Sequence, residues 1–156
     1  LRSSLGVSAV LWVNGELVGD DTDGHIDQLA RFVAPGCVVA ARQPDKSDPN
    51  HESLEANFAL LKSLRDARGR LLDVTPIDLP PHVFFEDIKL PASYLNFFIV
   101  NGGVIVPTFE HDLDAVAIAT IEQFFPGREV VPFSALELIR GRGAVHCVTC
   151  QQPALG

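Results

Sequence analysis

The stretch Tyr-Leu-Asn-Phe-Phe-Ile-Val-Asn-Gly-Gly-Val-Ile-Val (94–106) decides the fold class. Its two apolar arms, 94–100 and 104–106, are rich in aromatic and β-branched residues, which favour strands. Asn-Gly between two such arms is a strong signal for a tight turn. The sequence therefore predicts two antiparallel strands joined by a turn at 101–103.

A helix and a returning strand are predicted after this hairpin. Asp112 caps a helix whose apolar positions continue to Phe124, and Pro126-Gly127 ends it. The other predicted elements are a strand at 129–133, a helical turn at 134–140 and a last strand at 144–149. The second half of the chain thus consists of a hairpin, a helix and a returning strand.

The first half has a similar order of elements. Asp48-Pro49 is an N-cap followed by proline, the next apolar residues keep helical spacing to Leu64 or Arg65, and Gly69 is a stop signal. The other predicted elements are strands at 8–13, 32–33, 37–41 and 71–76 and loops at 14–28 and 82–92. If loop 14–28 joins two strands, a unit of about 70 residues is repeated, on topology alone. The fold class is α/β, and Trp12 and the phenylalanines are assigned to the core.

Composition narrows the class of protein. A chain of 156 residues with 47% hydrophobic and 21% charged residues fits one folded domain. The formal charge of −8 argues against a nucleic-acid partner and suits a cationic ligand. No apolar stretch is long enough to cross a membrane, and no secretory signal is visible. Three cysteines indicate a reducing cytoplasm and no disulfide framework.

Cys147 is the candidate nucleophile. It follows His146 and the glycines at 141 and 143, and a nearby imidazole or a polar strand end can lower the pKa of a thiol. The alternative is a purely structural role as a small apolar residue in a strand, and this role explains Cys37 better than a catalytic one. Cys147 and Cys150 also form a CxxC, so a redox pair, or a zinc site with His146 and His25, are further alternatives.

The acidic segment Gly-Asp-Asp-Thr-Asp-Gly-His-Ile-Asp (19–27) is the second candidate for chemistry. In an extended segment His25 and Asp27 share one side, so the imidazole can move a proton while the carboxylate grips a guanidinium. The segment lacks the ligand spacing of a calcium loop, and a solvated loop is the bland alternative. Asn96, placed mid-strand among apolar residues, is expected to line a polar pocket.

Together these pieces resemble the agmatine deiminase and bacterial peptidylarginine deiminase family. The segments that carry the resemblance lie at 19–36, 93–107, 125–131 and 146–153. The resemblance implies a five-bladed α/β-propeller (pentein) of ββαβ units, of which this chain holds about two. It implies Cys147 as nucleophile, His25 as general acid and base, and Asp27 as a guanidinium ligand. Further substrate-binding candidates are Asn96, Asp21 and Thr22.

The implied reaction is hydrolysis of a guanidinium with release of ammonia, without a metal or organic cofactor. Agmatine, giving N-carbamoylputrescine in polyamine synthesis, is the first choice of substrate, and peptidyl-arginine is the second. A zinc module that uses Cys147 and Cys150 is a rival from another class.

Two departures from the family pattern bear on activity. Cys150 stands where the family more often has Gln, and the family's upstream Asp and Glu are not in this chain. The chain also has no Met. We therefore expect residues 1–156 to be the C-terminal portion of a deiminase domain. Such a portion either associates as a homo-oligomer or with an N-terminal half, or is a catalytically incomplete half-domain.

Overall fold

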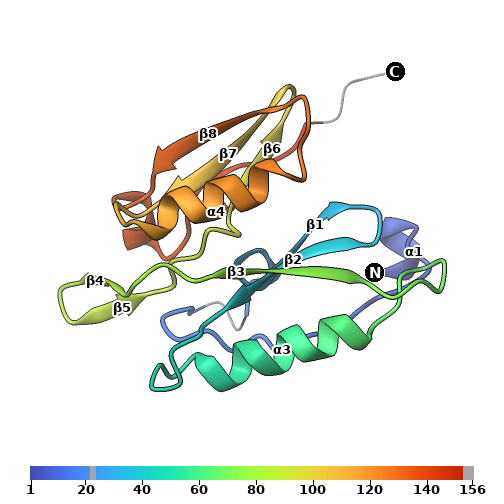
Figure 1. Ribbon diagram of the computed structural model, residues 1–156, viewed down its shortest axis with the longest axis horizontal. Coiled ribbons are helices and arrows are strands. Elements are labelled where there is room, and N and C mark those ends of the chain that lie inside the picture. Colours follow the sequence, from blue (N-terminus) through green and yellow to red (C-terminus); the bar gives the residue numbers. More distant parts are fainter. Residues whose placement is uncertain (22–23, 153–156) are drawn as a thin grey trace.

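Two three-stranded sheets with the same connectivity organise the chain (Figure 1). The computed structural model describes residues 1–21 and 24–152. In each sheet an antiparallel hairpin is followed by a helix and a strand that returns parallel to the central one. The first sheet holds β1 (Ala30–Ala34), β2 (Cys37–Arg42) and β3 (Asp73–Asp78), with α3 (His51–Ser63) before β3. The second holds β6 (Phe98–Val100), β7 (Gly103–Thr108) and β8 (Glu129–Ser134), with α4 (Leu113–Glu122) before β8.

The predicted hairpin at 94–106 is confirmed in its turn and its second arm. Val100 pairs with Gly103 and Phe98 with Ile105. Gly102 takes a φ of +80°, which a residue with a Cβ adopts at a cost. The first arm is shorter than predicted, because residues 94–97 form a turn ahead of β6.

The central strand β2 is buried on both faces and joins two layers of core. Val39 and Ala41 point into the large cluster that includes Ile121 of α4, whereas Val38 and Ala40 point toward Leu61 of α3. This alternation follows from the period of two along a strand. Helix α3 therefore covers one face of the first sheet, and α4 packs between the two sheets (Figure 1).

The predicted strand at 8–13 is wrong. Leu11 and Val13 do pack on the smaller core cluster, but Trp12 between them is 74% exposed. The continuing segment at 14–18 is held by amide side chains of α3 and its N-cap in place of a neighbouring strand. Asn57 Oδ1 accepts from Asn14 N–H at 2.8 Å, and Asn57 Nδ2 donates to Asn14 O at 2.8 Å. Asn57 thus anchors the segment that follows residues 8–13, which are themselves irregular.

Other local expectations also need correction. Residues 82–92, predicted irregular, form a hairpin of β4 (Val83–Phe85) and β5 (Ile88–Leu90). Residues 144–149, predicted as a strand, contain the 3₁₀ turn η2 (His146–Val148). The helical turn expected at 134–140 is η1 (Leu138–Gly141). Two short helices, α1 (Arg2–Leu5) and α2 (Ile26–Leu29), were not predicted. Four of the phenylalanines assigned to the core are exposed, namely Phe32, Phe84, Phe85 and Phe133.

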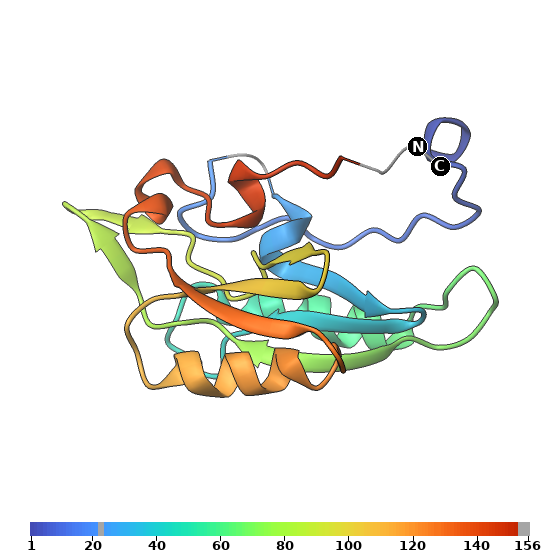
Figure 2. The same cartoon turned by 90° about the horizontal axis from the view of Figure 1, so that it is seen from above.

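In the part of the chain that the structure describes, no helix has both the length and the apolar character needed to span a bilayer. The C-terminal segment, red in Figure 2, returns over α2 near the start of the chain. This return brings the two polar segments of the sequence to one place.

Candidate active site

Two segments far apart in the sequence meet at one cluster of reactive side chains. Functional atoms of His25, Asp27 and Cys147 all lie within 4.8 Å of one another. His25 and Asp27 come from the start of α2, and Cys147 comes from η2. The thiol, imidazole and carboxylate that the sequence singled out are therefore close enough to act on one substrate group.

Helix α2 places His25 and Asp27 in a different way from the extended segment predicted. His25 is the N-cap residue, exposed, and Asp27 lies in the first turn with its side chain mostly buried. Asp20 Oδ2 accepts from His25 N–H at 3.1 Å. Gly24 has a φ of +98°, and a Cβ on it would lie 2.4 Å from Gly15 Cα. The close approach of these glycines fixes where the helix begins.

Asn96 is a fully buried hub of this cluster. Its Oδ1 accepts from the backbone N–H of Ala144 at 3.1 Å, of His146 at 3.0 Å and of Cys147 at 3.3 Å. Its Nδ2 donates to Asp27 Oδ2 at 3.0 Å and lies 3.1 Å from Cys147 Sγ. Three amides that a strand at 144–149 would have used in a ladder are therefore turned toward one side chain.

The carboxylate of Asp27 gathers the polar groups of the site. His146 Nδ1 lies 2.6 Å from Asp27 Oδ2, and because an ionised carboxylate only accepts, Nδ1 carries the hydrogen. Cys147 Sγ donates to the same oxygen at 3.4 Å. The pairing of His146 with Asp27 could not be predicted from local pattern, because the two residues come from opposite ends of the chain.

The surroundings of Cys147 favour the protonated thiol. Burial of the sulfur raises the pKa of Cys147, the Asn96 amide opposes that shift, and the Asp27 carboxylate adds to it. A cation bound at Asp27 would cancel the last of these effects. The electrostatics therefore favour a thiolate when a positively charged group is present.

Gly143 leaves the space in which Cys147 sits. A Cβ on Gly143 would lie 2.6 Å from Cys147 Cβ and 2.9 Å from Sγ, closer than real contacts allow. A residue larger than glycine at position 143 would therefore clash with Cys147, a steric requirement that the spacing in the sequence did not show.

The sequence profile of the Porphyromonas-type peptidyl-arginine deiminases matches residues 1–153. The chain belongs to this family. A Legionella pneumophila (strain Paris) protein, provisionally named an agmatine deiminase, is 42% identical over 98% of this chain and 44% of its own length. The agmatine deiminase of Ectopseudomonas mendocina (strain ymp) is 39% identical over 99% of this chain and 47% of its own.

A solved structure shows that family members share this fold. A Porphyromonas gingivalis protein, provisionally named an arginine deiminase, superposes with a TM-score of 0.94 at 44% identity. The match covers 97% of this chain and 45% of that one. The chain therefore spans a little under half the length of the deiminases that it matches.

The other residues proposed from the sequence lie around the cluster. Asp21 is half-exposed and pairs with Arg142 at 3.1 Å, whereas Thr22 lies outside the described residues. Cys150 is exposed, with Sγ near Gln151 O, and is not a member of the close group that contains Cys147. Within residues 1–21 and 24–152, the set that could hold a metal is His25, Asp27 and Cys147, which differs from the alternative zinc set that includes Cys150.

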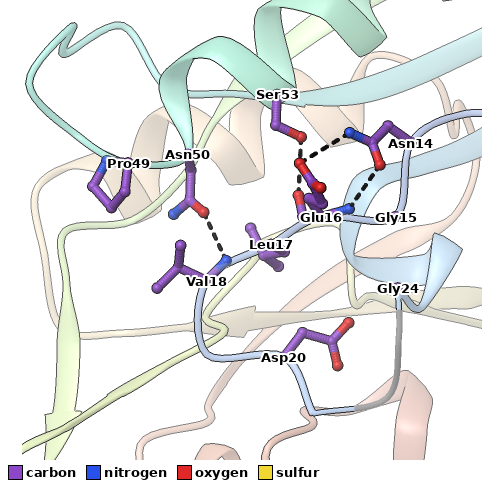
Figure 3. Close-up of a pocket in the computed structure, with 10 residues that line it drawn as sticks. All are labelled: Asn14, Gly15, Glu16, Leu17, Val18, Asp20, Gly24, Pro49, Asn50 and Ser53. Carbon is purple, nitrogen blue, oxygen red and sulfur yellow. Dashed lines mark hydrogen bonds between the residues drawn. The ribbon is translucent and has the colours of Figure 1, made fainter.

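A separate cavity borders the acidic segment of this deiminase-family chain (Figure 3). It has a volume of about 510 Å³ and lies between residues 14–18 and the start of α3. Asp20 and Gly24 line it, but His25, Asp27 and Cys147 do not. The hydrogen bond from Val18 N–H to Asn50 Oδ1, 2.7 Å long, closes one wall.

Proposed function

We propose that this chain carries the nucleophilic site of a cysteine-dependent deiminase, which hydrolyses a guanidinium group and releases ammonia. The observation that carries the proposal is the convergence of His25, Asp27 and Cys147 within 4.8 Å. Family membership and the acidic surroundings of the thiol support it. The reaction class suits a thiol that becomes reactive when a cation neutralises its neighbouring carboxylate.

In the first half of the reaction, Asp27 binds the planar cation by charge-assisted hydrogen bonds. Cys147 Sγ passes its proton to His25 and bonds to the central carbon. The bond from that carbon to one nitrogen breaks, and this nitrogen leaves as ammonia with a proton delivered by His25. A covalent thiouronium intermediate remains on the sulfur.

In the second half, His25 takes a proton from water as the water oxygen bonds to the same carbon. The carbon–sulfur bond then breaks, and Cys147 leaves with the electron pair and is reprotonated. The product is a substituted urea, so the overall change is guanidinium plus water to urea plus ammonium. No external oxidant or reductant is consumed.

Asn96 is assigned a positioning part in this reaction in place of the direct substrate contact predicted from the sequence. It is fully buried, and both polar atoms of its side chain already bond within the protein. Asp21 keeps its proposed place as a further guanidinium ligand, which requires it to exchange Arg142 for the substrate. Thr22 keeps its proposed role on the strength of the resemblance alone.

We propose agmatine as the first substrate, because the relatives that cover this chain at 39–42% identity are named agmatine deiminases. Peptidyl-arginine is the second candidate, and it is favoured by the description of the family.

The two sheets of like topology fit two ββαβ units of a five-bladed propeller. Free cysteines, which the described structure leaves unpaired with one another, suit the cytoplasm.

The test is ammonia release from agmatine and from an arginine-containing peptide, with Cys147→Ala as the blank and Cys150→Ala as the matched thiol control. We expect Cys147→Ala to abolish release and Cys150→Ala to keep it. Release that survives Cys147→Ala would overturn the assignment of the nucleophile. Because His25, Asp27 and Cys147 could also hold a metal, the assay is repeated with a chelator, which we expect to change nothing.

The rival is that the chain is a structural half-domain with an incomplete site. It covers under half of the relatives' length, and the resemblance places a second guanidinium-binding Asp upstream. Absence of release from both substrates by the unaltered chain would favour this rival over turnover by residues 1–156.

A further inference from the structure

Arg31 of β1 is a partly buried arginine that the sequence analysis did not single out. Its Nη1 donates to Leu95 O at 2.9 Å and to Phe97 O at 2.8 Å. The guanidinium also lies over the Phe97 ring, 4.5 Å from its centroid. Two carbonyls and an aromatic face thus hold the cation from β1 against the turn before β6.

The two carbonyls bound by Arg31 belong to the residues on either side of Asn96. The backbone on both sides of Asn96 is therefore fixed, and the Asn96 side chain contacts the thiol. Asn96 Nδ2 reaches Cys147 Sγ, and Asn96 Oδ1 accepts from the Cys147 backbone N–H. Arg31 therefore reaches Cys147 in two steps: hydrogen bonds fix the backbone of residues 95–97, and the Asn96 side chain carried by that backbone bonds to Cys147.

The charge of Arg31 also affects the Cys147 thiol. Burial lowers the pKa of Arg31, and the charges of Asp27 and Cys147 oppose that shift. Electrostatic interaction is mutual, so the charges that favour the guanidinium cation are themselves favoured by it. Arg31 therefore offsets part of the burial that keeps the Cys147 thiol protonated.

We propose that Arg31 is a positioning residue of the deiminase site: it fixes the turn around Asn96 and so holds the amide that orients Cys147. The importance of this role for catalysis rests on the proposed function. Its test does not, because the position of Asn96 can be measured without turnover. Arg31 touches neither the thiol nor a substrate and acts through Asn96.

The test compares Arg31→Gln and Arg31→Lys with the unaltered chain. Glutamine removes the charge, whereas lysine keeps it without the planar stacking on Phe97. Arg128→Gln is the matched control, because Arg128 Nη1 also donates to a backbone carbonyl, that of Val100 at the far end of β6. Circular dichroism and thermal unfolding establish that each variant is folded.

Two readouts report the position of Asn96 without requiring turnover. Hydrogen exchange, followed by NMR, measures the amides of Ala144, His146 and Cys147, which all donate to Asn96 Oδ1. We expect Arg31→Gln to speed their exchange about tenfold relative to β7 amides. Alkylation of Cys147 by iodoacetamide across pH is expected to slow about tenfold at neutral pH. Arg31→Lys is expected to fall between, and Arg128→Gln to match the unaltered chain.

A folded Arg31→Gln with unchanged exchange and unchanged alkylation would overturn the proposal. If Arg31→Gln does not fold, Arg31→Lys decides by the same two measurements. Altered readouts in a chain that releases no ammonia would keep the positioning role and refute the proposed function. If Arg31→Gln releases ammonia at the full rate and both readouts are unchanged, the positioning role is refuted and the proposed function is kept.

Discussion

At the scale of single residues, Asp27 is where the chemistry and the architecture of the site coincide. One oxygen of its carboxylate receives hydrogen bonds from Asn96, His146 and Cys147. Burial raises the pKa of Cys147, and the Asp27 carboxylate, the proposed ligand of a cationic substrate, adds to that shift. Binding and activation are therefore linked through one side chain.

We expect Asp27→Asn to make Cys147 more reactive while it abolishes turnover. The carboxylate raises the pKa of Cys147, so its removal lowers that pKa and increases the thiolate fraction at pH 7. Each unit of lowering would speed alkylation by about tenfold below the pKa. Iodoacetamide kinetics measure the effect, with Asp45→Asn, an exposed carboxylate beside Ser47, as control. Alkylation at an equal or slower rate would contradict the electrostatic argument.

Much of the candidate site could be predicted from the sequence at this scale. The motif residues His25, Asp27 and Cys147 were named in advance, and the structure brings them together. The sequence indicates His146 only as an imidazole beside the thiol or a zinc ligand, and it gives no signal for Arg31. His146 contacts a residue 119 positions away in the sequence, and Arg31 contacts residues at least 64 positions away. Both contacts depend on side-chain directions that no local pattern encodes.

At the scale of elements, a buried carboxylate ties the β4–β5 hairpin to the start of α3. Asp48 is almost fully buried, and its side chain contacts His82 and Lys89 of the hairpin region and accepts from Asn50 N–H at 2.8 Å. Burial by itself raises the pKa of Asp48, but these hydrogen bonds and the Lys89 cation outweigh it, so the pKa lies below its usual value.

We expect Asp48→Asn to lower the free energy of unfolding at pH 7 by about 1–3 kcal/mol, the cost of breaking buried polar bonds. Because the folded pKa is depressed, the ionised carboxylate stabilises the protein above its unfolded pKa near 4 and loses that effect as the pH falls through the folded value. The difference between variant and parent, measured by urea titrations, should therefore shrink as the pH falls below the unfolded pKa.

Glu55→Gln is the control for Asp48→Asn. The Arg42–Glu55 pair is partly exposed on both sides, so its loss should cost at most about 1 kcal/mol. Exchange of the amides at 83–85 and 88–90 should rise in Asp48→Asn alone. A loss of stability that persists undiminished at low pH would show that packing, and not the charge, is responsible.

The success of prediction differed between elements for physical reasons. The body of helix α3 was located well, because its helical spacing is clear in the sequence. Its ends differ from the prediction: the N-cap is Asn50 and not Asp48, and the helix ends at Ser63, before Gly69. The strand at 144–149 failed because the Asn96 side chain accepts from backbone amides that a sheet neighbour would have bound. The segment 8–13 is irregular although Leu11 and Val13 pack on the smaller core cluster, so its apolar residues did not distinguish it from a strand. The β4–β5 hairpin was missed because its turn uses Glu86 at a φ of +53°, and no glycine marks it.

At the scale of the whole molecule, a large apolar surface lies beside the first sheet. Trp12 is 74% and Phe32 57% exposed. Phe32 and Val7 line a shallow hollow of about 710 Å³ between the N-terminal segment and β1. Exposed apolar area of this kind marks a surface that pairs with another chain or segment.

We expect the isolated chain to self-associate through this surface. Sedimentation velocity should show a mean mass that grows with concentration, and Phe32→Lys should shift the population toward monomer. Val116→Lys on α4, also at an exposed apolar position, should leave the distribution unchanged. A monodisperse monomer at every concentration would contradict this expectation.

The distance in sequence between Asp27 and His146, which lie 2.6 Å apart, also sets the timing of activity. Both sheets are complete at Ser134, whereas the thiol comes from Cys147. A nascent chain can therefore form its two sheets on the ribosome and stay inert toward guanidinium compounds until residue 147 has cleared the exit tunnel. For the same reason, a protease cutting between 142 and 146 would silence the proposed reaction and leave both sheets intact.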